Sequence, residues 1–284
     1  QRAAEYLGAA AWAGREAQEA RYLWPYMFAR VAEEYEERFG LDRAYLRGIS
    51  ANNFANAKKN PHSQTRGWAI TDDHLGENDD VNPLIEGSLR KSDCGQVTDG
   101  AAAVFLASRA VAEAYAKRRG ISIDAIPRIK GWGHATAPLL YSTKVAGSRG
   151  EPYVFPSVRK AMMDALARAG MPDIYACDGV EVHDCFSITE YMAIDHFGIT
   201  APGESWRAVE DGTIALGGRL PVNPSGGLIG LGHPVGATGV RMLLDGWRQV
   251  TGNAGDYQVE GARNIATFNV GGSATTAVSF VVGV

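Results

Sequence analysis

The stretch Asn223–Gly239, NPSGGLIGLGHPVGATG, is the most informative part of the sequence, because six of its seventeen residues are glycine. Glycine lets a backbone approach another group closely or take a left-handed conformation. An apolar helical pattern follows at Val240, Leu243, Leu244 and Trp247. We therefore expect a tight turn that leads into the N-terminus of a helix.

This stretch fits neither common nucleotide-phosphate loop. No Lys-Ser or Lys-Thr follows the glycines, and Val235 stands where the dinucleotide fingerprint needs a small residue. What remains is His233, held between Gly232 and Pro234 just ahead of a helix N-terminus, whose positive end favours an anion or a thiolate. Such a histidine suits work as a base or in an oxyanion hole. The alternative is a histidine packed in a glycine turn.

The second motif is His183-Asp184-Cys185-Phe186, at the junction between an expected strand, Gly179–His183, and an expected helix, Ser187–Phe197. The carboxyl ends of strands are where α/β proteins place ligands. A continued strand puts His183 and Cys185 on the same side, whereas a turn separates them. The alternative is a buried apolar cysteine beside a surface histidine.

The third motif, Asn269-Val270-Gly271-Gly272-Ser273, joins two expected strands, Asn264–Val270 and Ala274–Val282. Taken alone, it is a hairpin turn. A backbone N–H at Gly271 would also be able to face an oxyanion, since glycine permits close approach.

Elsewhere, strands alternate with helices, which predicts a covered α/β sheet. The expected helices are Pro25–Phe39, Asp42 to about Lys58, Ser108 to Gly120, and Pro156–Ala169; the expected strands are Ala101–Ala107 and Arg128–Trp132. After the helix that ends at about Lys58, the segment Asn60–Lys91 is rich in glycine, proline and acidic residues. This composition predicts a long, functional loop.

The formal net charge of -4 argues against a nucleic-acid partner, since nucleic-acid binders usually carry a basic surface. No stretch approaches the roughly 20 apolar residues that span a bilayer, and the first residues do not resemble a signal peptide. Cys94, Cys177 and Cys185 show no CxxC spacing, so we expect neither disulfides nor a metal site. We expect a cytoplasmic protein.

In this order, the three motifs resemble the thiolase superfamily, and HDCF with GGLIGLGHPVGATG resembles its sterol carrier protein-type thiolases and acetyl-CoA acetyltransferases. The run TDGAAAVFLAS, Thr98–Ser108, is similar too, and NPHSQTR, Asn60–Arg66, more weakly. The resemblance covers essentially the whole chain. It implies a layered αβαβα fold of two halves, with the loop domain and the end of the first half in residues 1–120 and the second half in 121–284.

The chain opens in an alanine-rich helical stretch with no strand before it. We therefore expect the first half to be incomplete, without the segment that carries the nucleophilic cysteine of the family. Cys94 lies in a different place and is no substitute. This chain alone is accordingly expected not to catalyse thiolysis.

The resemblance also implies roles for the motif residues. His233 is similar to the histidine that activates the nucleophile and stabilises the thioester oxyanion, and His183 stands in the place of an oxyanion-hole residue. Gly271 is similar to the glycine whose N–H lines a second oxyanion hole. Asn269 stands where most thiolases carry an acid/base cysteine, a role that Cys185 takes in the sterol carrier protein type.

The implied activity is a CoA-dependent acyltransferase or thiolase reaction, namely thiolytic cleavage or Claisen condensation of acyl-CoA thioesters. Coenzyme A or acyl-CoA would be a substrate, with no covalently bound cofactor. The implied partners are a second copy of the chain and a small OB-fold protein. Two alternatives stay open: a thiolase-like steroid side-chain aldolase, which needs no cysteine nucleophile, and a catalytically degenerate acyl-CoA or lipid-binding module.

Overall fold

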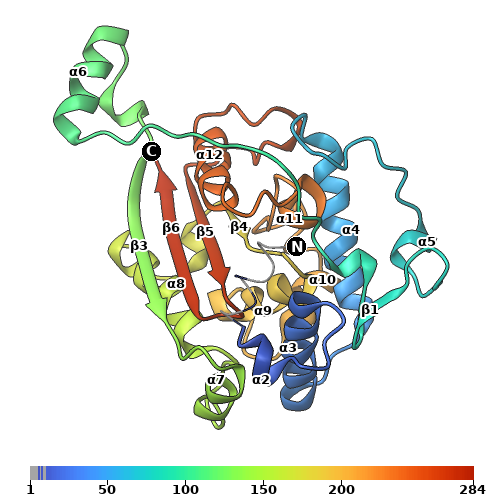
Figure 1. Cartoon of the computed structure of the whole chain (residues 1–284). Helices are drawn as coiled ribbons and strands as arrows, with labels where there is room; N and C mark the ends of the chain where they lie inside the picture. The colour runs from blue at the N-terminus through green and yellow to red at the C-terminus, as the bar shows by residue number, and fades with distance from the viewer. Residues whose placement is uncertain (1–5, 7, 9–10) are drawn as a thin grey trace.

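A computed structural model describes residues 6, 8 and 11–284 of the chain (Figure 1). Its main sheet has four strands in the order β3-β6-β5-β4. The strand bounds are β3 Arg128–Thr136, β4 Gly179–Val182, β5 Asn264–Gly271 and β6 Thr276–Gly283. The strands β3, β6 and β5 run antiparallel, and β4 pairs with β5 in parallel. The expected α/β class is confirmed.

Helices cover both faces of this sheet (Figure 1). On one face, α8 (Pro156–Arg168) and α9 (Ser187–Phe197) pack against the side chains that share the side of Phe268. On the other face, Gly246 of α12 (Thr238–Val250) lies against Val282 and Ile265. Two further helices, α3 (Leu23–Phe39) and α4 (Arg43–Lys59), form an outer layer over α9.

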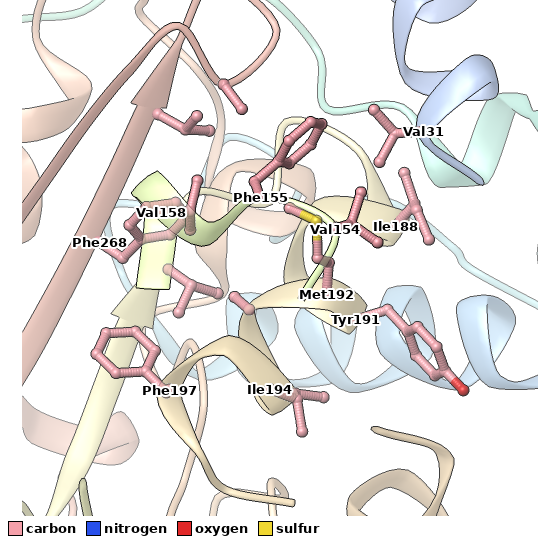
Figure 2. Packing of buried hydrophobic residues seen from close by; sticks show 14 of the residues in the cluster. Val31, Val154, Phe155, Val158, Ile188, Tyr191, Met192, Ile194, Phe197 and Phe268 are labelled. Atoms are coloured by element: carbon pink, nitrogen blue, oxygen red, sulfur yellow. The ribbon is translucent and has the colours of Figure 1, made fainter. Parts of the chain in front are cut away.

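The hydrophobic core lies between these layers, around α9 (Figure 2). Every residue of α9 is buried, because the sheet lies on one side of this helix and α3 and α4 on the other. Val31 of α3 and Phe155 beside α8 contribute to the same cluster as Ile188 and Phe268. The end of β4, where the HDCF motif begins, is therefore packed in the hydrophobic core.

The helices predicted from Pro25 onward form within a few residues of their expected bounds. The alanine-rich helical stretch expected at the start of the chain lies largely outside the described residues. Asp42 caps α4 by accepting the backbone N–H of Ala44 at 2.8 Å. Gly120 ends α6 (Arg109–Arg119) in a left-handed conformation. The remaining helices are short: α2 Ala13–Glu16, α5 Asp72–Leu75, α7 Tyr141–Gly147, α10 Ser205–Glu210 and α11 Gly227–Leu231.

One predicted element is wrong. Ala101–Ala107 does not form a strand, and the side chains of Phe105 and Leu106 are 102% and 74% exposed. An apolar run forms a strand only where a neighbour accepts its backbone hydrogen bonds, and no strand of the described residues pairs with it. Figure 1 shows this segment crossing the molecule to α6, which stands away from the sheet.

The expected loop Asn60–Lys91 is mostly irregular, but it contains α5 and a small two-stranded sheet, β1 Leu84–Glu86 with β2 Leu89–Arg90. The domain boundary between residues 120 and 121 stays a prediction. Within the described residues, no helix combines the length and apolar character needed to cross a bilayer.

We predict that Gly133→Ala destabilises the fold. A Cβ at Gly133 would overlap the carbonyl oxygen of Ala161, because α8 lies with its backbone directly on β3. Such overpacking typically costs about 1–3 kcal/mol. Urea unfolding of this variant should show a lower midpoint, while Gly217→Ala, where a Cβ meets nothing within 4 Å, should unfold like the wild type. Equal midpoints for all three proteins would contradict the direct contact between α8 and β3.

Candidate active site

The HDCF motif turns as soon as β4 ends. The backbone N–H of Asp184 donates to the carbonyl oxygen of Val182 at 3.1 Å, so the strand does not continue and His183 and Cys185 separate. The Sγ of Cys185 lies 3.8 Å from the Oγ1 of Thr189 in the first turn of α9. Burial raises the pKa of Cys185 to about 12, so this residue is a neutral thiol at pH 7, able to donate a proton.

His183 is held by Asn269 of β5. The Nδ1 of His183 lies 3.0 Å from the Oδ1 of Asn269, whose Nδ2 points to the sulfur of Met242. With the amide turned this way, Nδ1 carries the proton and Nε2 has the free lone pair; a reversed amide would leave Nε2–H as a donor. Burial lowers the pKa of His183 to about 4, so the ring is neutral at pH 7. The orientation of Asn269 thus sets the tautomer of His183.

His233 follows α11 and is held by the first residue of α12. Its Nδ1 lies 2.7 Å from the Oγ1 of Thr238, and that hydroxyl donates its one hydrogen to the carbonyl oxygen of Pro234. His233 must therefore donate through Nδ1, which leaves Nε2 as a proton acceptor. Burial, with a smaller effect of His183, lowers the pKa of His233 to about 3.

The structure brings His183 and His233 together, although fifty residues separate them in the sequence. Their ring centroids are 5.2 Å apart and the rings are nearly perpendicular. Each ring has its Nδ1 engaged by a neighbouring polar side chain. Two neutral imidazoles with defined tautomers thus meet at the carboxyl end of a strand, which is a suitable arrangement for moving a proton.

The backbone of residues 95–98 links the two motifs. The N–H of Gly95 donates to the carbonyl oxygen of Cys185 at 2.8 Å, and the N–H of His233 donates to that of Gln96 at 3.1 Å. The N–H of Thr98 in turn donates to the carbonyl oxygen of His233 at 3.2 Å. A groove of about 430 Å³ lies between residues 98–102 and residues 234–237 with Val240, directly after His233 in the sequence.

Gly271 is exposed at the end of β5, two residues beyond Asn269 and on the same face of the strand. The expected turn between β5 and β6 is present, but it is not a simple hairpin. Gly272, Ser273 and Ala274 all have left-handed φ values, of 59°, 51° and 66°. A role of the Gly271 N–H toward an oxyanion stays a prediction.

Asp184 was not identified as a site residue from the sequence, yet it joins the two main motifs. Its buried carboxylate accepts the backbone N–H groups of Leu228 at 2.6 Å and Ile229 at 3.0 Å, in the first turn of α11, and the Nδ2 of Asn53 at 2.9 Å. Gly227, with a φ of 62°, leaves the space, because a Cβ there would overlap this carboxylate. In the sequence, the Gly226-Gly227 pair directly before an apolar helical turn was the one feature that indicated a close approach of another group to the start of α11.

A second set of buried polar residues lies under the site. Glu181 accepts both the N–H and the hydroxyl of Ser225, and Arg241 of α12 donates to that hydroxyl and to Asp245. Burial, reinforced by the charge of Asp245, raises the pKa of Glu181 to about 8. The buried face of α12 carries Arg241 and Asp245, while Trp247 of the apolar pattern is 42% exposed.

We predict that Asp184→Asn destabilises the protein strongly. One carboxylate oxygen of Asp184 accepts from Leu228 and the other from both Ile229 and Asn53, so an amide NH₂ would face donors in either orientation. A buried unsatisfied group typically costs about 1–3 kcal/mol. Urea unfolding at neutral pH should show this loss, while Asp256→Asn, at an exposed position, should not change the midpoint. A wild-type midpoint for Asp184→Asn would show that the two motifs are joined by other contacts.

Comparison with known proteins identifies the family of the chain. Residues 141–284 match the family described as "Thiolase C-terminal domain-like". The chain is 34% identical over 254 residues to an acetyl-CoA acetyltransferase of Methanothermobacter thermautotrophicus, covering 89% of this chain and 62% of that protein. It is 30% identical over 262 residues to sterol carrier protein 2 of Gallus gallus, covering 92% and 46%. The chain thus spans less than two thirds of either relative.

Solved structures show the same fold at low identity. The Ltp2-ChsH2(DUF35) aldolase superposes with a TM-score of 0.69 at 19% identity, covering 92% of this chain and 63% of that one. A monomeric SCP2-thiolase like protein type 1 from Mycobacterium smegmatis superposes with a TM-score of 0.62 at 15% identity, covering 91% and 51%. With the family match over residues 141–284, the chain belongs to the thiolase C-terminal domain-like family of the thiolase superfamily.

Proposed function

We propose that the protein is a CoA-dependent thiolase-type acyltransferase, which cleaves or condenses acyl-CoA thioesters. The observation that carries the proposal is the pair of neutral imidazoles, His183 and His233, with ring centroids 5.2 Å apart and both Nδ1 atoms engaged. The similarity to the acetyl-CoA acetyltransferase of Methanothermobacter thermautotrophicus supports the same activity.

Thioester chemistry of this kind needs proton transfer and stabilisation of an oxyanion or enolate. In the proposed site, the free Nε2 of His233 accepts a proton from the attacking group. The Cys185 thiol, whose pKa burial raises to about 12, stays protonated and supplies a proton to a carbanion. Gly271 contributes its N–H, and the free Nε2 of His183 acts as a second base in the orientation that Asn269 has in the structure.

The attacking thiolate is assigned to none of the three cysteines. Cys185 serves for proton transfer in this proposal, and burial raises the pKa of Cys94 and of Cys177 as well, to about 12 for Cys177. Both are far from being thiolates at pH 7, and a thiol in that state is a poor nucleophile.

Retro-aldol cleavage of a β-hydroxyacyl-CoA thioester is the second candidate. It is supported by the superposition with the Ltp2-ChsH2(DUF35) aldolase. This reaction needs a base and an enolate-stabilising group but no thiolate. The Nε2 of His233 would take the proton of the substrate hydroxyl, and the released enolate would be stabilised as in the first candidate. A homo-oligomer, a small OB-fold partner and a cytoplasmic location stay predictions.

The test is an assay of acetoacetyl-CoA thiolysis with the product of the complete reading frame that contains these residues. We predict that His233→Ala lowers kcat/KM about a hundredfold or more, because it removes the base. His134→Ala, at an exposed position on β3, is the matched control and should keep wild-type activity.

Three other outcomes would contradict the acyltransferase proposal or the role of His233 in it. Turnover of His233→Ala within a few fold of the wild type would show that His233 is a packing residue. Cleavage of a β-hydroxyacyl-CoA that survives treatment with a thiol-alkylating reagent, with no thiolysis, would establish the retro-aldol function. Binding of acyl-CoA with no turnover of either substrate would establish a binding module.

A further inference from the structure

Lys144 is a buried cation outside the motifs, on α7, and only 6% of its surface is exposed. Its ammonium group is surrounded by acceptors from one short segment. The Nζ lies 2.6 Å from the carbonyl oxygen and 3.1 Å from the hydroxyl of Ser273, 2.9 Å from the Oγ1 of Thr275 and 3.3 Å from the carbonyl oxygen of Gly272. An ammonium has three hydrogens, so these contacts use its full donor capacity.

The segment that Lys144 holds is the turn between β5 and β6, which has an unfavourable backbone. Gly272, Ser273 and Ala274 are all left-handed, and such a conformation costs about 1–2 kcal/mol for a residue other than glycine. A turn of this kind persists only where its surroundings impose it. The carbonyl groups of Gly272 and Ser273 both point at the Lys144 ammonium, which compensates for that cost.

This turn directly follows the part of β5 that reaches the candidate active site. Asn269 contacts His183, and Gly271 is the last residue of β5 before the turn. Asn269 and Gly271 lie on one face of the strand, so a shift of the turn changes both the tautomer-setting contact of His183 and the position of the Gly271 N–H.

The helix that carries Lys144 is itself fixed at both ends. At its start, the carboxylate of Glu16 accepts the N–H groups of Tyr141 and Ser142 at 2.8 and 2.9 Å. At its end, the guanidinium of Arg38 donates to the carbonyl oxygen and the hydroxyl of Ser148 at 3.0 and 2.9 Å. Burial lowers the pKa of Lys144 to about 8, with Glu16 acting in the opposite direction, so the ammonium is charged at pH 7.

From these contacts we propose that Lys144 is a positioning residue for the proposed reaction: it fixes the turn at residues 272–275 and thereby holds Gly271 and Asn269 in place against His183. The inference rests on the proposed function for its catalytic part. Its structural part, the restraint of the turn by Lys144, is independent of that function.

The test compares Lys144→Met, which keeps the length of the side chain without its charge, with Lys160→Met on α8. Lys160 is a matched control, because its side chain is 65% exposed and pairs with Asp164 on the surface. Hydrogen–deuterium exchange reports the turn directly. We expect the amides of residues 271–276 to exchange about tenfold faster or more in Lys144→Met than in the wild type and in Lys160→Met.

Kinetics of the complete enzyme report the catalytic part. We expect Lys144→Met to lower kcat about tenfold or more with KM almost unchanged, since small misplacements of catalytic groups act on the transition state. Lys144→Arg, which keeps the charge, should recover part of that loss.

The exchange experiment tests the restraint of the turn, and the kinetics test the positioning role. Unchanged exchange of residues 271–276 in Lys144→Met would overturn the restraint of the turn. Faster exchange with wild-type kcat would show that Lys144 is a structural residue alone and would overturn the positioning role, with the proposed function intact. A wild-type enzyme without activity on any acyl-CoA thioester would overturn the proposed function and the catalytic part together, and the exchange measurement would then decide the structural part.

Discussion

The contact between the Asp184 carboxylate and the first turn of α11 is the constraint on which the site depends. It ties the end of β4 to the glycine-rich stretch and so sets His183 opposite His233. The backbone N–H groups at a helix start lack partners within the helix, and a buried carboxylate is a strong acceptor for them. Two glycines of α11 allow this packing: a Cβ at Gly227 would overlap Asp184, and one at Gly230 would overlap the backbone of α4 at Asn53.

Burial of so many polar groups also explains the protonation states of the site. Burial raises the pKa of Asp184 to about 6 and raises that of Glu190, while it lowers the pKa values of both histidines. Asn53 and Asn223 both donate to Glu190 at 2.6 Å, and Asn223 also accepts the N–H of Val182 in β4. Such a network keeps the strand end rigid, because every displaced group would lose a hydrogen bond in a low-dielectric interior.

Much of the fold was predictable from the sequence because its signals are local. Asp42 as a cap, Gly120 and Gly198 as helix ends, and the alternating strands near the C-terminus each depend on a few neighbouring residues. The strand expected at Ala101–Ala107 failed because a strand depends on a partner elsewhere in the chain. The buried face of α12 could not be predicted, because Arg241 and Asp245 are buried as a pair with Glu181 and Ser225, which hydrophobic periodicity does not indicate.

The site was predictable only in part, for the same reason. The residue types and their motifs indicated His183, Cys185, His233 and Gly271, but the meeting of the two histidines depends on the tertiary contact made by Asp184. Asn269 and Thr238 fix the histidine tautomers. Their role could not be predicted, because it depends on how β5 and α12 pack beside the two histidines. The sequence did not indicate a role for Lys144, since a lysine in a short helix usually faces solvent.

His183 and His233 form a pair of neutral imidazoles with Nδ1 bound and Nε2 free. NMR of the ¹⁵N-labelled imidazoles across a pH titration measures this most directly. We expect both rings to be neutral and protonated on Nδ1 at pH 7, and neither to titrate until the pH falls toward 4. Two rings that titrate near the ordinary histidine pKa of about 6.5, with no tautomer preference, would contradict it.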